Sequence, residues 1–495
     1  MSRRVLIVGL VGLFAFASRA WADEKEQKPE EVQAKAESDS GAVVKFDKGF
    51  RLQTKDGRHE MRIAGSAHLD VRTYYGASTA PHSFDIRRAR IDVMGRMFKD
   101  LLDLRIQAAL EDNPYIRNAY IDIKCAPFLH LMVGQMKVPF STEWLTFDNN
   151  VNFMERNTGT PFYAFFDRGG MLWGELLKGT VTYNFGVYTG AGVDLDATKG
   201  DIDKSKDIVW RLFLQPFKTV KVKAINGLYL VGQGTWGYQS TPTKRFEVSG
   251  LSAPDYESLV WRWRTEQVLA DNGRERDVIS AEVGQRTRFG AELIYLYGPF
   301  TLYGEWAMVQ YKDIDIYHNY FVGSNRKKHD LVLSRDGTMH AFTIWASYFI
   351  TGEEKVLNNF GFKQPVPKRQ VGEGGFGAFE LLARFSGTFT DKALFDKVKV
   401  SGFKDVDGKD GIGSTSSVNA SVLEGAYRLY EVTGGVSWTM NQFVRLQLNY
   451  TYLWDPTDSQ NGIVSAGGSD LSDITKKNKL IKSEHFLGLR FIFKI

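Results

Sequence analysis

The chain has 495 residues, of which 43% are hydrophobic and 13% aromatic, with 48 glycines and 13 prolines. Its formal net charge of +5 is too small to indicate a protein that binds nucleic acid. Beyond the amino-terminal segment no run of about eighteen apolar residues occurs, which excludes membrane-spanning helices. Many aromatic residues and glycines with few prolines favour short strands separated by turns.

The amino terminus has the features of an export signal. Arg3 and Arg4 precede a short apolar run, and Ala20-Trp21-Ala22 matches the small-residue cleavage pattern. We therefore predict a signal peptide over residues 1–22. A soluble secreted protein would carry the same signal, so it indicates export and not membrane insertion. The next segment, residues 23–59, begins with many Glu, Lys and Gln residues and is predicted to be a polar linker or a short helix.

From residue 60 onward, apolar and polar residues alternate in short segments. In Met61–Val71 the odd positions are all apolar, whereas the even positions include Arg62 and Asp70. The final segment, His485–Ile495, alternates in the same way. Successive side chains of a strand point to opposite faces, so each segment has one apolar and one charged face. This pattern predicts an all-β fold, a transmembrane antiparallel β-barrel over residues 60–495.

The links between the predicted strands also fit a barrel of about sixteen strands, because short turns and long loops alternate. Tight links such as 98–101 and 298–300 are predicted at the periplasmic end. Long stretches such as 240–284 and 389–426 are predicted outside the cell. The stretch 351–375 is the exception, since it is long for a periplasmic turn and the sequence gives no account of it.

Arginines on the inward-facing positions are the main constellation of charged residues. Side chains two apart on a strand lie about 7 Å apart, within the Debye length of about 8 Å, so the fields of Arg88 and Arg90 overlap. Such a wall would concentrate anions in a narrow passage. Alternatively, the arginines pair with carboxylates and only brace the wall. The predicted pore-lining residues are Arg62, Arg72, Arg88, Arg90, Arg96 and Arg105, and the carboxylates available to them are Asp70, Asp92, Asp103 and Glu111.

The sequence contains no pattern that indicates an enzyme. The eight His residues lack H-E-x-x-H spacing, and G-x-S-x-G does not occur. Gly372–Gly377 matches G-x-G-x-x-G, but an alternating strand follows where a dinucleotide site needs a helix. Asp405–Gly411 resembles a calcium loop with one residue too many and no closing Glu, so we interpret it as a solvated turn. We predict no catalytic residue, no cofactor and no metal.

Several short segments occur in a characteristic order from about residue 60 to the end of the chain. They are Arg87-Arg88-Ala89-Arg90, Arg117–Tyr120, Val133–Ser141, Phe153–Arg156, Ser347–Glu353, Gly377–Ser386 and Val444–Tyr450. In this order the chain resembles the phosphate-selective porin O and P family. The resemblance implies a homotrimeric outer-membrane channel of sixteen strands with ladders of arginine. It also implies that the third outer loop, here about Pro139–Arg168, folds into the lumen as a constriction.

The predicted constriction loop departs from the family at one point. Phosphate-selective members carry lysine just ahead of the Glu-Arg pair, whereas Thr146–Asn152 contains no basic residue. We therefore do not expect specificity for phosphate. The predicted constriction residues are Asp148, Asn149, Asn150, Glu155, Arg156 and Arg168.

Together these features predict a passive porin in the outer membrane of a Gram-negative bacterium. We expect it to lie in outer-membrane lipid as a homotrimer and to conduct small hydrophilic solutes by diffusion, with a preference for anions. The alternative is a structural or adhesive barrel whose outer loops bind a partner. Single-channel conductance separates the two.

Overall fold

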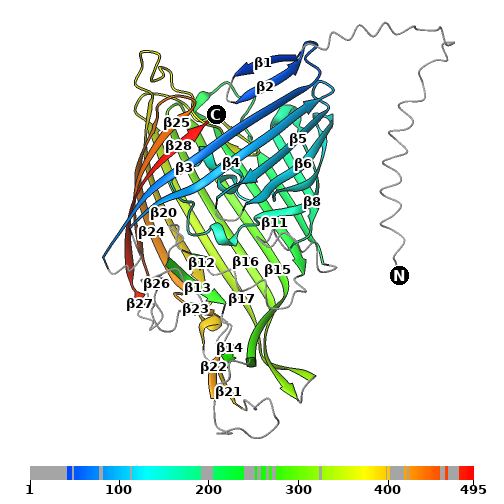
Figure 1. Cartoon of the computed structure of the whole chain (residues 1–495), viewed down its shortest axis with the longest axis vertical. Coiled ribbons are helices and arrows are strands. Elements are labelled where there is room, and N and C mark those ends of the chain that lie inside the picture. Colours follow the sequence, from blue (N-terminus) through cyan, green and yellow to red (C-terminus); the bar gives the residue numbers. More distant parts are fainter. Residues whose placement is uncertain are drawn as a thin grey trace, which may run out of the picture. The chain divides into compact units, whose positions relative to one another are not determined.

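The computed structural model shows a closed antiparallel β-barrel (Figure 1). The described residues all belong to one compact unit, Ala42–Ile495. They are residues 42–46, 49–76, 82–111, 114–190, 205–238, 251–252, 258–263, 267–269, 275–322, 326–396, 398–401, 417–420, 423–456, 463–465 and 479–495.

Sixteen strands pair in chain order, and the last of them, β28, pairs with the first, β3, which closes the barrel. These strands are β3 (Glu60–Gly76), β4 (Ser83–Met97), β5 (Leu102–Ala109), β6 (Tyr115–Ala126), β7 (Leu129–Lys137), β8 (Phe166–Leu176), β9 (Val181–Tyr188), β10 (Asp207–Leu214), β11 (Leu228–Tyr238), β15 (Glu275–Tyr297), β16 (Phe300–Val322), β17 (Arg326–Phe349), β20 (Ala378–Thr390), β24 (Arg428–Thr439), β25 (Val444–Trp454) and β28 (Ser483–Lys494). The predicted fold class is confirmed.

The alternating pattern of β3 also has the predicted orientation. Met61, Ile63 and Leu69 are exposed on the outer face, by 42%, 38% and 40%. His68 and Asp70, on the other face, are buried inside the barrel. The apolar outer face suits contact with lipid, and the polar inner face lines the lumen.

Shorter elements complete the described chain. The small strands are β12 (Leu251–Ser252), β13 (Ser258–Trp263), β14 (Gln267–Leu269), β18 (Leu357–Asn358), β19 (Gly361–Phe362), β21 (Val398–Ser401), β22 (Ser417–Ala420), β23 (Leu423–Gly425), β26 (Ile463–Ser465) and β27 (Lys479–Ile481). The helical turns are α2 (Thr142–Leu145), η1 (Asp148–Asn150), η2 (Thr160–Phe162), η3 (Leu177–Gly179), α3 (Lys223–Asn226) and η5 (Lys392–Phe395). Among the described residues, no helix is both long enough and apolar enough to cross a membrane.

A β-hairpin precedes the barrel and corrects part of the sequence interpretation. The strands β1 (Ala42–Phe46) and β2 (Phe50–Thr54) pair with each other, and β2 pairs with the start of β3. The prediction of a polar linker or short helix over residues 23–59 is therefore wrong for this part, because apolar and polar residues alternate in Phe50–Thr54 and Ala42–Phe46 contains the β-forming residues Val43, Val44 and Phe46. Residues 1–41 lie outside the described part, so the signal peptide stays a prediction.

The connection between β17 and β20 returns into the barrel. Its hairpin, β18 and β19, lies close enough to the lumen wall for the Phe362 ring to contact Trp345, with 5.4 Å between the ring centres. Phe362 is 4% exposed. The part of the stretch 351–375 from Lys355 to Phe362 is therefore a second segment inserted into the lumen, and the following residues bond to the turn between β24 and β25.

Candidate channel constriction

The loop between β7 and β8 folds into the barrel, as predicted for Pro139–Arg168. Its apolar side chains pack in two buried clusters against inward-facing residues of the wall. The loop contributes Val138, Phe140, Trp144, Tyr163 and Ala164 to one cluster and Phe153 to the other. Ser141, in the left-handed region at φ 63°, turns the chain into α2 and accepts a hydrogen bond from the Trp144 amide.

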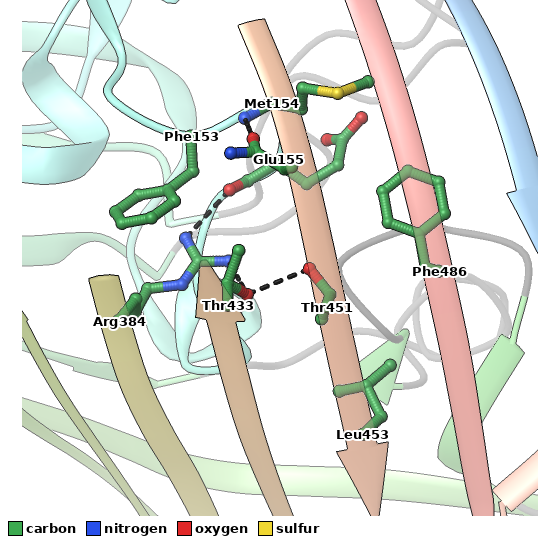
Figure 2. Close-up of a pocket in the computed structure, with 9 residues that line it drawn as sticks. Phe153, Met154, Glu155, Arg384, Thr433, Thr451, Leu453 and Phe486 are labelled. Carbon is green, nitrogen blue, oxygen red and sulfur yellow. Dashed lines mark hydrogen bonds between the residues drawn. The ribbon is translucent and has the colours of Figure 1, made fainter. Parts of the chain in front are cut away.

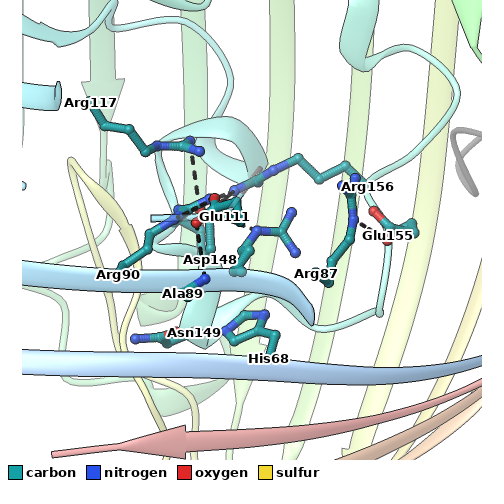
Figure 3. Close-up of polar contacts among 12 residues, drawn as sticks. His68, Arg87, Ala89, Arg90, Glu111, Arg117, Asp148, Asn149, Glu155 and Arg156 are labelled. Atoms are coloured by element: carbon teal, nitrogen blue, oxygen red, sulfur yellow. Dashed lines mark hydrogen bonds and ion pairs between the residues drawn. The ribbon is translucent and has the colours of Figure 1, made fainter. Parts of the chain in front are cut away.

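Asp148 of this loop lies among four arginines, of which Figure 3 labels Arg90, Arg117 and Arg156. Its Oδ1 contacts Arg156 Nη2 at 2.8 Å. Its Oδ2 pairs with Arg90 and lies 3.5 Å from Arg88 Nε and 3.6 Å from Arg117 Nη2. One carboxylate is thus shared by four guanidinium groups. We call this group the Asp148 cluster, and it comprises Asp148, Glu111, Arg88, Arg90, Arg117 and Arg156.

Glu155, further along the same loop, forms a second ionic group. Its Oε1 accepts from Arg72 at 2.6 Å and from Arg490 at 2.9 Å. Both arginines also contact Asp70, at 2.8 Å and 2.7 Å. Arg490 is completely buried, so this ion pair is shielded from water and depends on good geometry. This Glu155 cluster comprises Glu155, Asp70, Arg72, Arg87 and Arg490.

The arginines keep both loop carboxylates ionised. Burial alone would raise the pKa of Asp148, but the charges of Arg90 and Arg88 outweigh it and hold that pKa well below its usual value. Burial opposes ionisation of Glu155 too, and the neighbouring arginines, Arg87 and Arg490 first, hold its pKa below the usual value. The negative charges of Asp148 and Glu155 therefore persist at physiological pH.

Basic side chains of the wall also satisfy the loop backbone. Arg445 Nη1 donates to the Val151 carbonyl at 2.9 Å, and Arg490 donates to the Met154 carbonyl. Lys137 Nζ donates to the Trp144 and Thr146 carbonyls at 2.6 Å and 3.0 Å. Buried carbonyls that lack a partner are costly, so these bonds stabilise the irregular backbone of the loop inside the barrel.

Close packing against β28 needs a glycine. Gly488 faces the lumen, and a Cβ atom there would lie 2.7 Å from the Met154 sulfur. The missing side chain therefore leaves the space that Met154 fills.

The opposite side of the lumen presents carboxylates to the loop. Glu305 Oε2 accepts from the Ser141 hydroxyl at 3.1 Å and from the Tyr163 hydroxyl at 2.6 Å. Glu292 Oε1, directly across the strand pair, accepts from the Thr142 amide at 2.9 Å. At this wall the loop donates hydrogen bonds to carboxylates, whereas on the arginine side it accepts hydrogen bonds.

The segment inserted between β17 and β20 reaches the same loop. The Phe362 amide donates to Thr146 Oγ1 at 3.0 Å, and Asn150 Nδ2 donates to the Phe362 carbonyl at 3.3 Å. Lys355 joins the loop to the wall, because its Nζ lies 2.8 Å from Asn152 Oδ1 and 2.5 Å from Glu380 Oε1. Two segments thus meet inside the barrel.

Small cavities follow one edge of the loop. The cavity in Figure 2 lies between Phe153, Glu155 and the inward side chains of β20, β24, β25 and β28. Arg384 crosses its wall and donates to the Glu155 carbonyl at 2.9 Å. A second cavity lies beside Trp345 and Phe362. Each has a volume of about 10 Å³, close to the space of a single water.

The structure brings together only some of the predicted pore-lining residues. Arg72, Arg88 and Arg90 contact the loop carboxylates, as described above. Arg105 pairs with Asp92 at 2.7 Å and lies over the Phe147 ring of the loop, 4.5 Å from its centre. Arg62 and Arg96 lie near the start of β3 and the end of β4, away from both clusters. Whether these residues line the path stays a prediction.

The predicted constriction residues are likewise divided. Asp148, Glu155 and Arg156 belong to the two clusters. Asn149 Oδ1 lies 2.7 Å from His68 Nε2, and Asn150 contacts the segment inserted between β17 and β20. Arg168 lies at the start of β8 and donates to Gln135 at 3.2 Å, outside both clusters.

Two arginines of the ionic clusters that sequence reasoning missed lie at β-bulges. The register of β3 and β4 shifts at Arg87, and the register of β5 and β6 shifts at Arg117. A bulge places an extra residue opposite one partner and redirects its side chain. Arg87 therefore reaches Glu155 at 3.2 Å, and Arg117 reaches Asp148, although strict alternation would point both outward.

The part of the chain that the structure describes contains no group of three or more His, Cys, Asp or Glu residues placed to hold a metal ion. The stretch Asp405–Gly411, which resembles a calcium loop in sequence, lies outside the described residues.

A closed barrel of sixteen antiparallel strands with an outer loop folded into its lumen is the architecture of a porin. The chain belongs to the phosphate-selective porin O and P family, whose profile matches residues 61–214 and 261–461. It is therefore a passive channel of the Gram-negative outer membrane. No curated protein matches the chain.

Similar solved structures include OmpT of Vibrio cholerae, with 10% identity, a TM-score of 0.48 and coverage of 91% of this chain and 99% of that one. An anion-selective porin from Comamonas acidovorans has 10% identity, a TM-score of 0.47 and coverage of 88% and 100%. The outer membrane channel DcaP of Acinetobacter baumannii has 9% identity, a TM-score of 0.44 and coverage of 90% and 99%.

Proposed function

We propose that this porin conducts small hydrophilic solutes with a modest preference for anions and without specificity for phosphate. The observation that carries the proposal is the charge around the inserted loop. In the Asp148 and Glu155 clusters, seven arginines face four carboxylates, a surplus of three positive charges. Two of the carboxylates come from the loop itself, so the loop reduces the field of the wall without cancelling it.

The size of the preference follows from this partial neutralisation. A unit charge 4 Å from another interacts by about 1 kcal/mol in water and by more where water is thinned. Every 1.4 kcal/mol of interaction energy changes an equilibrium constant by about a factor of ten. The surplus of positive charge should therefore make the permeability for anions a few-fold to about tenfold greater than that for cations. Glu292 on the opposite wall reduces the preference further.

Arg87 and Arg117, the two arginines at the bulges, allow a test of this charge surplus. Their replacement leaves the shorter contacts to the loop carboxylates in place. Arg87→Gln with Arg117→Gln removes two charges at contacts of 3.2 Å and 3.6 Å. We expect the reversal potential in a salt gradient to move toward that of an unselective pore. Arg96→Gln, at a side chain that is 51% exposed, is the matched control and should change little. An unchanged potential in the double variant would contradict the assignment.

Single-channel conductance tests the channel itself. We expect steps of current in planar bilayers. Their absence from correctly folded protein would favour the alternative of a structural or adhesive barrel.

Assembly, processing and the lack of chemistry are part of the same proposal. We infer a homotrimer in outer-membrane lipid and a precursor cleaved after residue 22, supported by the family and by the sequence pattern of the amino terminus. Selection by width and field requires no covalent step, so we propose no catalytic residue and no cofactor. Native mass spectrometry of the purified protein would give both the subunit number and the mass of the mature chain.

A further inference from the structure

The arginines of the Asp148 cluster have the arrangement of an oxyanion site. Four guanidinium groups converge on one carboxylate, from β4, from β6 and from the loop itself (Figure 3). Guanidinium forks match planar or tetrahedral groups with several acceptor oxygens, such as carboxylate and phosphate. Only one such acceptor group, the Asp148 carboxylate, lies at the point where the four arginines converge.

The donors around Asp148 exceed what its two oxygens can accept. Arg88 Nη1 and Arg117 Nε are buried and have no hydrogen-bond partner among the described residues. Arg117 is only 9% exposed, so water does not readily replace a partner. Even with Glu111 included, four positive charges face two negative ones. A buried surplus of donors and of positive charge is the chemistry of a site for an anion.

We propose that Asp148 acts as a built-in anion, whose carboxylate occupies an oxyanion site formed by Arg88, Arg90, Arg117 and Arg156 and excludes free oxyanions from it. The inference rests on the proposed function and identifies the residue that determines its specificity. This porin lacks phosphate specificity because Asp148 fills the site, in addition to the absence of lysine from the loop. The occupied site also attaches the loop to the wall.

The substitution Asp148→Asn removes the charge and keeps the shape of the side chain. We expect it to create a site for free phosphate, measured as block of the chloride current through single channels. In the variant, half-block should occur at a phosphate concentration at least about tenfold lower than in the wild type, which corresponds to one pair of charge-assisted hydrogen bonds. Acetate, the free analogue of the replaced carboxylate, should block the variant more weakly than phosphate.

Two further variants separate the site from a general change of charge. Glu143→Gln removes one negative charge from the same loop at a side chain that contacts the Asn157 amide and Arg384, and it keeps the backbone carbonyl that accepts from Arg156. It should leave the channel insensitive to phosphate. Arg117→Gln, added to Asp148→Asn, should abolish the block. The proposal is overturned if Asp148→Asn is no more sensitive to phosphate than the wild type, or if Glu143→Gln gains the same sensitivity.

Refolding tests the same claim if the asparagine variant does not fold in chloride. A free anion should then replace the missing carboxylate, so phosphate should raise the refolding yield above that in chloride of equal ionic strength. Equal yields in the two buffers would overturn the proposal. A wild-type pore that prefers cations would contradict the proposed function, but the phosphate block of Asp148→Asn would still decide the present inference.

Discussion

The two walls of the lumen bind the inserted loop with opposite chemistry. The basic wall, formed by the inward faces of β3, β4, β6 and β28, presents arginines to which Asp148 and Glu155 of the loop are acceptors. The acidic wall, formed by β15 and β16, presents Glu292 and Glu305, to which the loop donates hydroxyl and amide groups. Both edges of the loop are therefore held in place. Only at the basic wall are charges of the loop paired with charges of the barrel.

Because of this difference, both walls hold the loop in place, but only the basic wall contributes to selectivity for anions. At the acidic wall neutral donors satisfy the carboxylates, so the loop brings no compensating charge to that side. At the basic wall the carboxylates of Asp148 and Glu155 pair with arginines. The arginines there still outnumber the carboxylates. The same loop thus forms the constriction and sets how much of the basic field remains.

Removing the part of the loop that spans both clusters should have the largest effect. Deletion of Asn149–Phe153 removes most of the segment between Asp148 and Glu155, including the Phe153 ring, and keeps Met154. We expect single-channel conductance to rise by about twofold or more, because the narrowest section limits the current. A barrel that folds normally with unchanged conductance would show that the loop does not narrow the pore.

Arg490→Leu should cost the most stability of any single substitution considered. It leaves Asp70 and Glu155 with one arginine fewer in a site without water, and breaking a buried ion pair costs about 3–5 kcal/mol. Arg96→Leu, at an exposed pair with Asp100, should cost about 0–1 kcal/mol. Urea titration of the folded barrel measures both, and equal losses would contradict the distinction between buried and exposed arginines.

Tyr163→Phe tests the acidic wall. The hydroxyl donates to Glu305 at 2.6 Å inside the barrel, so its loss should cost about 1–3 kcal/mol of stability. Tyr295→Phe, which removes an exposed hydroxyl bond to the Ala224 carbonyl, is the matched control and should cost about 0.5 kcal/mol. Because no charge changes, the reversal potential of both variants should equal that of the wild type.

The smallest effect is expected from moderate acid. The pKa values of Asp148 and Glu155 are held below their usual range, so the binding of the loop is at full strength above a pH of about 4 and is lost as the pH falls through the lower folded-state values. Conductance should therefore stay constant from about pH 8 to about pH 5. A step in conductance near neutral pH would contradict the stated pKa directions.

Strand periodicity was sufficient to predict the barrel, because the side-chain period of two is visible wherever a strand separates lipid from water. It identified the inward positions of Arg72, Arg88 and Arg90. It failed at Arg87 and Arg117, where a bulge reverses the alternation. In the part of β4 before the bulge at Arg87 the outward positions are even, and Ile86 is 60% exposed, whereas after the bulge they are odd, as at Ile91.

The partners of the arginines could not be predicted from strand patterns. Asp148 lies about sixty residues after Arg88 and Arg90 in the chain, so their contact depends on how the loop folds. The hairpin between β17 and β20 had no sequence signal beyond the length of the connection. The alternative that the arginines pair with carboxylates holds in part, because Asp70, Asp92 and Glu111 do bind arginines.

The central claim is that the loop leaves a surplus of positive charge in the constriction. The reversal potential of the wild-type channel in a potassium chloride gradient tests it most directly. We expect the reversal potential to have the same sign as the equilibrium potential of chloride. It should be larger at about 0.01–0.1 M salt and smaller at about 1 M, where the Debye length shrinks to about 3 Å. A potential of the sign given by potassium at low salt would contradict the claim, since the carboxylates of the loop and of the acidic wall would then dominate the field.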